Sequence, residues 1–97
     1  MESIIFSWDD RKNRSNQKKH GVSFEEAQSV FFDDKAIEYF DPDHSENEDR
    51  FLMLGLSYHL RVLVVSYCLY DNDSEIRIIS GRKATKKEQI IYRGGIR

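Results

Sequence analysis

The chain has 97 residues, of which 39% are hydrophobic and 33% are charged, and this length allows one small domain with a single core. The only cysteine, Cys68, excludes an intramolecular disulfide, and neither a signal-peptide pattern nor an apolar run of membrane-spanning length is present. We therefore expect a cytoplasmic protein without membrane contact. The formal net charge of −2 by itself disfavours binding to nucleic acid.

The charges are unevenly distributed along the chain. Residues 41–49 contain five acidic residues, and without this segment 15 basic residues stand against 12 acidic ones, a balance of +3. Residues 74–97 contain seven basic and two acidic residues, a balance of +5. Because a local field steers a polyanion more than the total charge does, the C-terminal part remains a candidate for contact with RNA.

The N-terminal third predicts one strand followed by two helices. Residues 4–8 are rich in β-formers, and the polar residues 10–20 fit a surface helix that begins after an aspartate cap and ends at Gly21. Ser23 and Glu26 have the spacing of a capping box at the start of a second helix. Its apolar residues recur at helical spacing and should face the core: they are Phe24, Ala27, Val30 and Phe31.

The rest of the chain predicts four strands and a last helix. The third of these strands is apolar on both faces, as a central strand covered on both sides is, and Gly55 suggests a bulge in the second. A turn at residues 71–73 precedes the fourth strand, and Thr85 with Glu88 repeats the capping-box spacing before a helix that ends near Gly94-Gly95. The predicted strands are residues 36–40, 51–56, 60–69 and 74–80. The order β-α-α-β-β-β-β-α predicts an α+β domain, residues 1–97, with two N-terminal helices and one C-terminal helix on an antiparallel β-sheet.

Two segments carry a resemblance to a known family. The first is Phe6-Ser7-Trp8-Asp9, with Asn16 and the run from Lys19 to Phe24, and the second is the run from Ile76 to Thr85, with Glu88 and Tyr92. In this order, and over nearly the whole chain, they resemble the BrnT ribonuclease toxins of bacterial type II toxin–antitoxin pairs. The order of elements also resembles the RelE/ParE toxin superfold, which hosts gyrase poisons as well, so the fold alone does not establish nuclease activity.

The resemblance implies an endoribonuclease toxin that uses no metal or other cofactor, inhibits translation and is neutralised by a cognate ribbon-helix-helix antitoxin. Such antitoxins dimerise, so the resemblance implies a 2:2 heterotetramer that binds operator DNA through the antitoxin. The histidines and Cys68 show no regular metal-ligand spacing. The alternative is a non-enzymatic module, namely a protein poison, a co-repressor with its antitoxin or an inactive relic, and the acidic balance favours this alternative.

Metal-independent RNA cleavage uses the 2′-hydroxyl as nucleophile, so the protein need supply only a base, an acid and cations. Arg77 and Arg82, inside the second motif, are the first catalytic candidates. Arg77 should project from the sheet face opposite Ile76 and Ile78, and Arg82, two residues beyond the expected strand end, could hold a phosphate with both arms of its guanidinium. The alternative is a pair of solvated arginines, each paired with an acid.

Lys19 and His20, at the end of the first helix, are further catalytic candidates, since histidine carries protons near neutral pH. His20 could equally be a cation at a helix C-terminus, and Lys19 with Asn16 could form a structural polar face. His44 lies among acidic residues, which favours its cationic form and a loop-ordering role. The RNA-binding candidates surround the start of the last helix: they are Lys83, Lys86, Lys87 and Tyr92. Tyr92 could stack on a base, although packing on the sheet is the stronger alternative for it.

Overall fold

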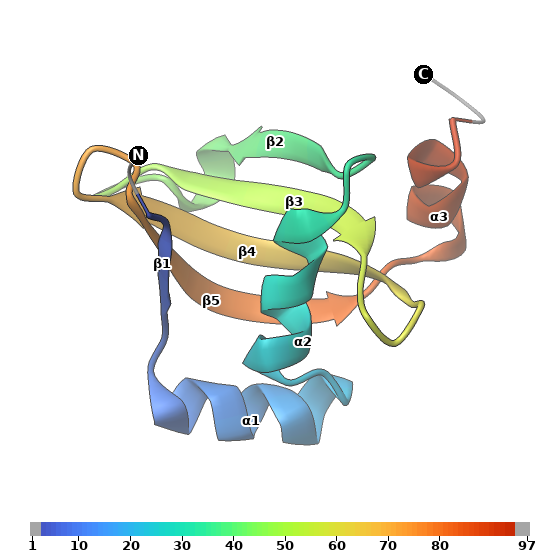
Figure 1. Cartoon of the computed structure of the whole chain (residues 1–97), viewed down its shortest axis with the longest axis horizontal. Coiled ribbons are helices and arrows are strands. Elements are labelled where there is room, and N and C mark those ends of the chain that lie inside the picture. The colour runs from blue at the N-terminus through green and yellow to red at the C-terminus, as the bar shows by residue number, and fades with distance from the viewer. Residues whose placement is uncertain (1–2, 95–97) are drawn as a thin grey trace.

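The computed structural model describes residues 3–94 and has the element order that the sequence predicts. Figure 1 shows α2 lying across one face of a twisted sheet, α1 along the side of β5, and α3 beyond the strand ends. The elements are β1 (Ile5–Ser7), α1 (Asp10–His20), α2 (Phe24–Ser29), η1 (Val30–Phe32), β2 (Ile37–Asp41), η2 (Pro42–His44), β3 (Arg50–Leu56), β4 (Val62–Tyr70), β5 (Glu75–Lys83) and α3 (Lys86–Tyr92).

The five strands form one sheet in the order β1-β5-β4-β3-β2. Strands β2 to β5 are antiparallel, while β1 pairs with β5 in parallel, from Ile5 opposite Glu75 to Ser7 opposite Arg77. The α+β class is confirmed, and β1 adds one parallel pairing to the antiparallel sheet that was predicted. A parallel pairing needs a long connection, and nearly the whole domain lies between β1 and β5 along the chain.

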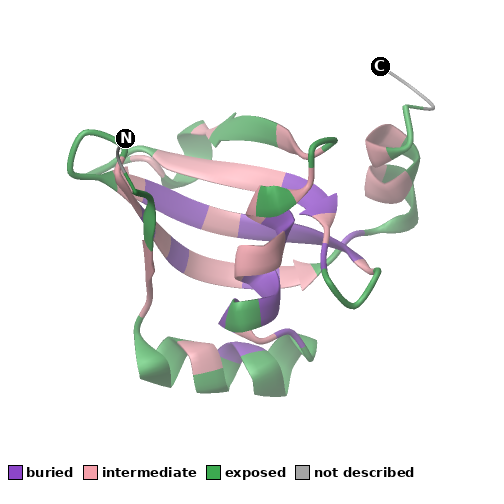
Figure 2. Cartoon of the chain, in the orientation of Figure 1, coloured by how far each residue is buried: buried purple, intermediate pink, exposed green. Residues whose placement is uncertain are grey.

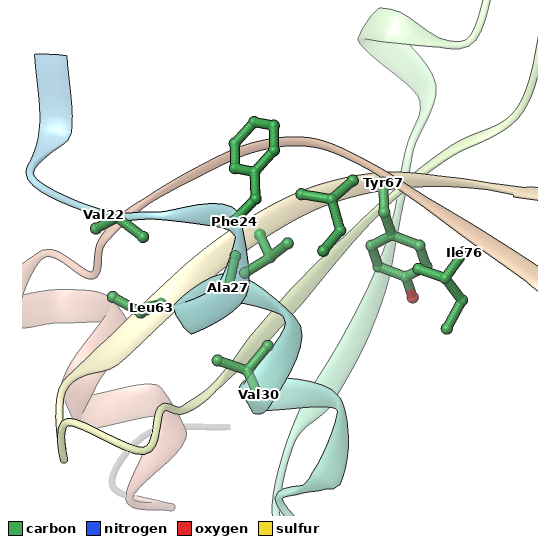
Figure 3. Packing of buried hydrophobic residues seen from close by; sticks show 9 residues of the cluster. Val22, Phe24, Ala27, Val30, Leu63, Tyr67 and Ile76 are labelled. Atoms are coloured by element: carbon green, nitrogen blue, oxygen red, sulfur yellow. The ribbon is translucent and has the colours of Figure 1, made fainter. Parts of the chain in front are cut away.

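The main core lies between the sheet and α2. Side chains from the α2 segment, among them Val22, Phe24 and Ala27, pack against β4 and β5 (Figure 3). The sheet side of this core consists of Leu63, Val65, Tyr67, Ile76 and Ile78. Figure 2 shows the buried residues in β4 and α2 and a largely exposed α1, which agrees with the polar sequence of α1. β4 is buried on both faces, as predicted.

We use the term open face for the side of the sheet turned away from this core. A smaller cluster at one end of the open face, built on Leu54, Val62 and Val64, packs against Ile91 and Tyr92 of α3. Toward the other end, this face carries polar and charged side chains. α3 therefore covers only part of the open face.

A β-bulge in β5 decides which side chains reach the open face. Opposite the adjacent residues Ser66 and Tyr67 stand Ser80 and Ile78, so Ile79 is an extra residue in β5. In a regular strand, residues five positions apart point to opposite faces, but one extra residue shifts the alternation and brings Arg82 onto the same face as Arg77. The bulge expected at Gly55 was wrong, because Gly55 stays in register opposite Leu63.

The position of Gly81 agrees with the changed alternation after the bulge, because Gly81 faces the main core. A Cβ atom at this position would lie 3.3 Å from the side chains of both Ala27 and Val22, in the main core. Gly81 therefore points inward, and its neighbour Arg82 points outward. β5 continues to Lys83, which corrects the expectation that Arg82 follows the strand, since antiparallel pairing with β4 extends through Leu63 opposite Lys83.

Candidate active site

Arg77 lies on the open face in a row of side chains that crosses four strands. Ile76 and Ile78 on either side of it are buried in the main core, so Arg77 projects to the other face, as predicted. The register places Asp41 opposite Arg50, Arg50 opposite Cys68, and Cys68 opposite Arg77. Directly paired residues point to the same face of a sheet, and we refer to Asp41, Arg50, Cys68 and Arg77 as the arginine row. Arg50 was not a candidate from the sequence, because only the strand register brings it near Arg77.

Glu48 stands over the middle of the arginine row. Its carboxylate accepts hydrogen bonds from the Tyr70 hydroxyl at 2.5 Å and from the Cys68 thiol at 3.4 Å. The bond from Tyr70, followed by the bond from Cys68, lowers the pKa of Glu48, so this carboxyl is ionised at neutral pH. The same contact raises the pKa of Tyr70 to about 12. The sequence presented Glu48 only as one charge of an acidic segment.

His44 lies in the same region, in the loop between β2 and β3. Its Nδ1 is 3.0 Å from Oδ2 of Asp41, the first member of the arginine row. His44, Glu48 and Arg50 share the lining of one hollow of about 310 Å³. The contact with Asp41 fits the loop-ordering role expected for His44, and the hollow also sets its exposed ring beside a carboxylate and a guanidinium.

Arg82 is held by a carboxylate of its own. Its Nη1 and Nη2 atoms donate to Oε1 and Oε2 of Glu88 at 2.8 and 2.9 Å. Glu88 also accepts from the backbone N–H of Thr85, which completes the predicted capping box of α3. The Arg82 contact, despite partial burial, lowers the pKa of Glu88 to about 2. The two arms expected to grip a phosphate are therefore filled by Glu88 in this structure.

The lysine candidates lie at the surface. Lys83 ends β5, and Lys86 and Lys87 begin α3, all three exposed. Lys19 and His20 end α1 and are also exposed, and within residues 3–94 neither side chain makes a hydrogen bond or an ion pair. Hence no contact in the described part of the chain joins His20 to the arginine row.

Asn16 and Tyr92 have structural partners. The Asn16 amide donates to the carbonyls of Val22 and Gly81, both at 2.8 Å, and accepts from the Gly81 N–H at 3.2 Å. It thus ties α1 to the strand segment beside Arg82. Tyr92 packs against the smaller cluster and donates to Asp33 at 2.5 Å, and burial, with this bond, raises its pKa to about 12. Its environment supports the packing alternative over base stacking.

Across residues 3–94, no helix has the length and apolar character that a membrane span requires. In the same part of the chain, no group of three or more His, Cys, Asp or Glu side chains is placed to hold a metal ion.

Comparisons with known proteins bear on the fold and the family of this chain. The fold is similar to that of the Brucella abortus ribonuclease toxin, BrnT, in a crystal structure at 1.1 Å resolution, with 23% sequence identity and a TM-score of 0.61 over 89% of this chain and 100% of that chain. A comparison with curated proteins finds no match. The family model for the ribonuclease toxin BrnT of type II toxin–antitoxin systems matches residues 8–88. This range includes the arginine row and both sequence motifs except for Phe6, Ser7 and Tyr92. This chain therefore belongs to the BrnT family of ribonuclease toxins.

Proposed function

We propose that this toxin is an endoribonuclease that cleaves RNA without a metal ion and binds the substrate on the open face. The observation that carries the proposal is the β5 bulge, which puts Arg77 and Arg82 on one face. Arg82 is the nearer of the two, along the chain, to the lysines at the start of α3. Guanidinium groups bind phosphate and stabilise the negative charge that develops at phosphorus during cleavage. Lys86 and Lys87 would then hold the flanking backbone. Lys83, which pairs with Leu63 on the other face of the sheet, remains a candidate from the family motifs, together with Lys19, His20 and Tyr92.

The purified chain, free of its partner, is expected to degrade single-stranded RNA in the presence of EDTA. Attack by the 2′-hydroxyl leaves a 2′,3′-cyclic phosphate and a 5′-hydroxyl, and end-group analysis of the products measures both. Parallel reactions in buffer and in a translating extract separate free RNA cleavage from ribosome-dependent cleavage. RNA that stays intact in both, or is cut only with added Mg²⁺, contradicts the proposal and favours a non-enzymatic module.

We further propose that the toxin acts in the cytoplasm, inhibits translation and is neutralised by a ribbon-helix-helix antitoxin in a 2:2 complex that binds operator DNA. A groove of about 190 Å³ on the open face, lined by Tyr39, Leu52, Leu54, Val64, Glu88 and Ile91, borders the Arg82–Glu88 pair. A partner segment with aromatic and acidic side chains suits this surface, because it would fill the apolar groove and meet the cations beside it.

Reversing the charge of Lys86 and Lys87 to glutamate is expected to slow association with the antitoxin and to reduce its dependence on salt. Steering by exposed charges acts mainly on the association rate, which stopped-flow mixing measures at several ionic strengths. The double substitution of Lys12 and Lys18 on α1 to glutamate removes the same charge from another exposed surface and serves as the control. Equal effects of the two double variants would place the antitoxin elsewhere.

A further inference from the structure

RNA cleavage needs a base and an acid as well as cations, and Arg77 and Arg82 supply neither. The hollow beside the arginine row contains both kinds of group. We propose that Glu48 is the general base of the reaction, that His44 is the general acid, and that Arg50 binds the phosphate together with Arg77. This inference rests on the proposed ribonuclease function.

The position of Glu48 favours a role as base. Its carboxylate is bound to the thiol of Cys68, the residue between Arg50 and Arg77 in the arginine row, so it stands between the two guanidinium-bearing strands. The hydrogen bonds from Tyr70 and Cys68 fix the orientation of the carboxylate. Each of its oxygens keeps a free lone pair, which can accept a further hydrogen bond or a proton. A phosphate held by the two arginines would bring the adjacent 2′-hydroxyl to this carboxylate.

Arg50 is free to bind an anion even though it stands in an acidic neighbourhood. Five acidic residues occupy positions 41–49, yet within residues 3–94 Arg50 forms no ion pair, and its buried Nε has no hydrogen-bond partner. Buried donors are rarely left unpaired in folded proteins. Arg82 differs, because Glu88 takes up its donors. Arg50, whose Nε is unpaired within the described residues, is therefore available to act on a phosphate together with Arg77.

His44 has the contact that an acid needs. Nδ1 lies 3.0 Å from Oδ2 of Asp41, a contact that orients the ring and leaves Nε2 as the ring nitrogen that can face a substrate. Because Asp41 is the end of the arginine row on β2, His44 stands on the far side of Arg50 from Glu48's partner Cys68. The acid and the base are thus tied to opposite neighbours of Arg50 in the arginine row, which would let them act on different oxygens of a phosphate held at Arg50.

The proton balance of the reaction closes with these groups alone. Glu48 takes the proton from the 2′-hydroxyl, the 2′-oxygen forms a bond to phosphorus, the bond from phosphorus to the 5′-oxygen breaks, and His44 gives its proton to that oxygen. The products are the cyclic phosphate and the 5′-hydroxyl. Glu48 is left protonated and His44 neutral, and exchange with water restores both.

The competing interpretation is that Glu48 only ties the loop to the sheet and neutralises the arginine row. The two roles predict opposite effects of Glu48→Gln. A glutamine keeps one acceptor oxygen for the Tyr70 hydroxyl, and its amide N–H can donate to the Cys68 sulfur, a weak acceptor. The side chain therefore stays tied to the sheet, while the base and one negative charge are lost. If Glu48 only neutralises the arginines, the variant should bind RNA more tightly and cleave at least as fast. If Glu48 is the base, the Glu48→Gln variant is expected to bind 2′-O-methyl RNA at least as tightly as the wild type, with kcat reduced by about 10²–10⁴-fold.

Glu46→Gln is the matched control, because Glu46 lines the same hollow and its substitution removes the same charge. Its kcat is expected to stay within about threefold of wild type. The pH–rate profile gives a second readout. Activity should rise with pH as the base ionises and fall as the acid is lost, in a field set by Lys12, Asp41, Asp43, Glu46, Arg50 and Arg77. Glu48→Gln should remove the acidic limb and His44→Gln the alkaline limb.

The outcomes separate this inference from the function on which it rests. A wild-type chain that leaves RNA intact overturns both. A wild-type chain that cleaves RNA, with Glu48→Gln nearly as fast or no slower than Glu46→Gln, overturns the base assignment alone. Loss of the alkaline limb in His20→Gln, and not in His44→Gln, would move the acid to the end of α1.

Discussion

Replacing Arg77 by alanine is expected to lower kcat for RNA cleavage by about 10²–10³-fold, the loss seen when one donor to transition-state charge is removed. The strand beneath Arg77 is fixed by the burial of Ile76 and Ile78, so the guanidinium is presented without reorganisation. Single-turnover cleavage of a short RNA measures the effect. Because Arg77 is only half-buried and forms no ion pair within residues 3–94, the free energy of unfolding should change by no more than about 0.5 kcal/mol.

Arg82→Ala is the informative companion to this variant. If Arg82 also binds the phosphate, its removal should slow cleavage by a similar factor of about 10²–10³. Arg14→Ala, an exposed arginine of α1, serves as the control for the loss of one positive charge. Rates for Arg77→Ala and Arg82→Ala that equal the wild-type rate would show that the arginines are solvated surface residues.

Replacing Arg61 by alanine is expected to lower the free energy of unfolding at pH 7 by about 3–5 kcal/mol, the usual cost of leaving one buried charge without its partner. Glu26 on α2 is only 2% exposed. It accepts from Nε of Arg61 at 2.9 Å and from the Ser57 hydroxyl at 2.7 Å, and it forms an ion pair with Arg61. Arg61 also donates to the Gly21 carbonyl at 3.0 Å, so one side chain joins the loop before β4 to both N-terminal helices.

The pH dependence of this loss has a definite sign. In the wild type, burial raises the pKa of Glu26, but the bonds from Arg61 and Ser57 outweigh burial and hold the pKa below its ordinary value. A lowered folded-state pKa gives stability that is present above the unfolded pKa and is lost as the pH falls. Without Arg61, burial dominates and raises the pKa of Glu26 above its ordinary value. The folded state of the variant therefore gains stability relative to the unfolded state as the pH falls.

The difference in stability between wild type and Arg61→Ala should therefore shrink between pH 7 and pH 4. Urea denaturation at several pH values measures it, and Lys35→Ala, which removes an exposed cation, is the control. A difference that stays constant over this range would mean that Glu26 is not the carboxyl responsible.

Local signals in the sequence predicted the elements and their order. Asp9 and Ser23 cap α1 and α2 as expected, with side-chain oxygens that accept from the first backbone N–H groups, because capping depends only on neighbouring residues. The facing of Arg77 also followed from a local pattern, the alternation with Ile76 and Ile78. Element boundaries moved by one to three residues, most at the end of β5, where pairing with β4 extends the strand.

The missing parts of the prediction all depend on long-range register. Arg50, Cys68 and Arg77 come from three strands, and their alignment is set by pairing across the sheet, which no local pattern encodes. Glu48 is held at the site by hydrogen bonds from Tyr70 and Cys68, which lie about twenty residues further along the chain. The acidic segment 41–49 therefore looked like a solvated region in the sequence.

The extra residue in β5 has a consequence for comparing relatives by alignment. Because Ile79 is the extra residue, deleting it would reduce the spacing of the two arginines from five to four, and a regular strand with that spacing still presents both arginines on the open face. Two homologues with the arginines at spacings of four and five residues can therefore present the same surface, one with a regular strand and one with a bulge. A homologue that kept the spacing of five in a regular strand would instead turn its second arginine toward the helices, so an alignment that matches the arginines without a gap can pair residues that face opposite sides of the sheet.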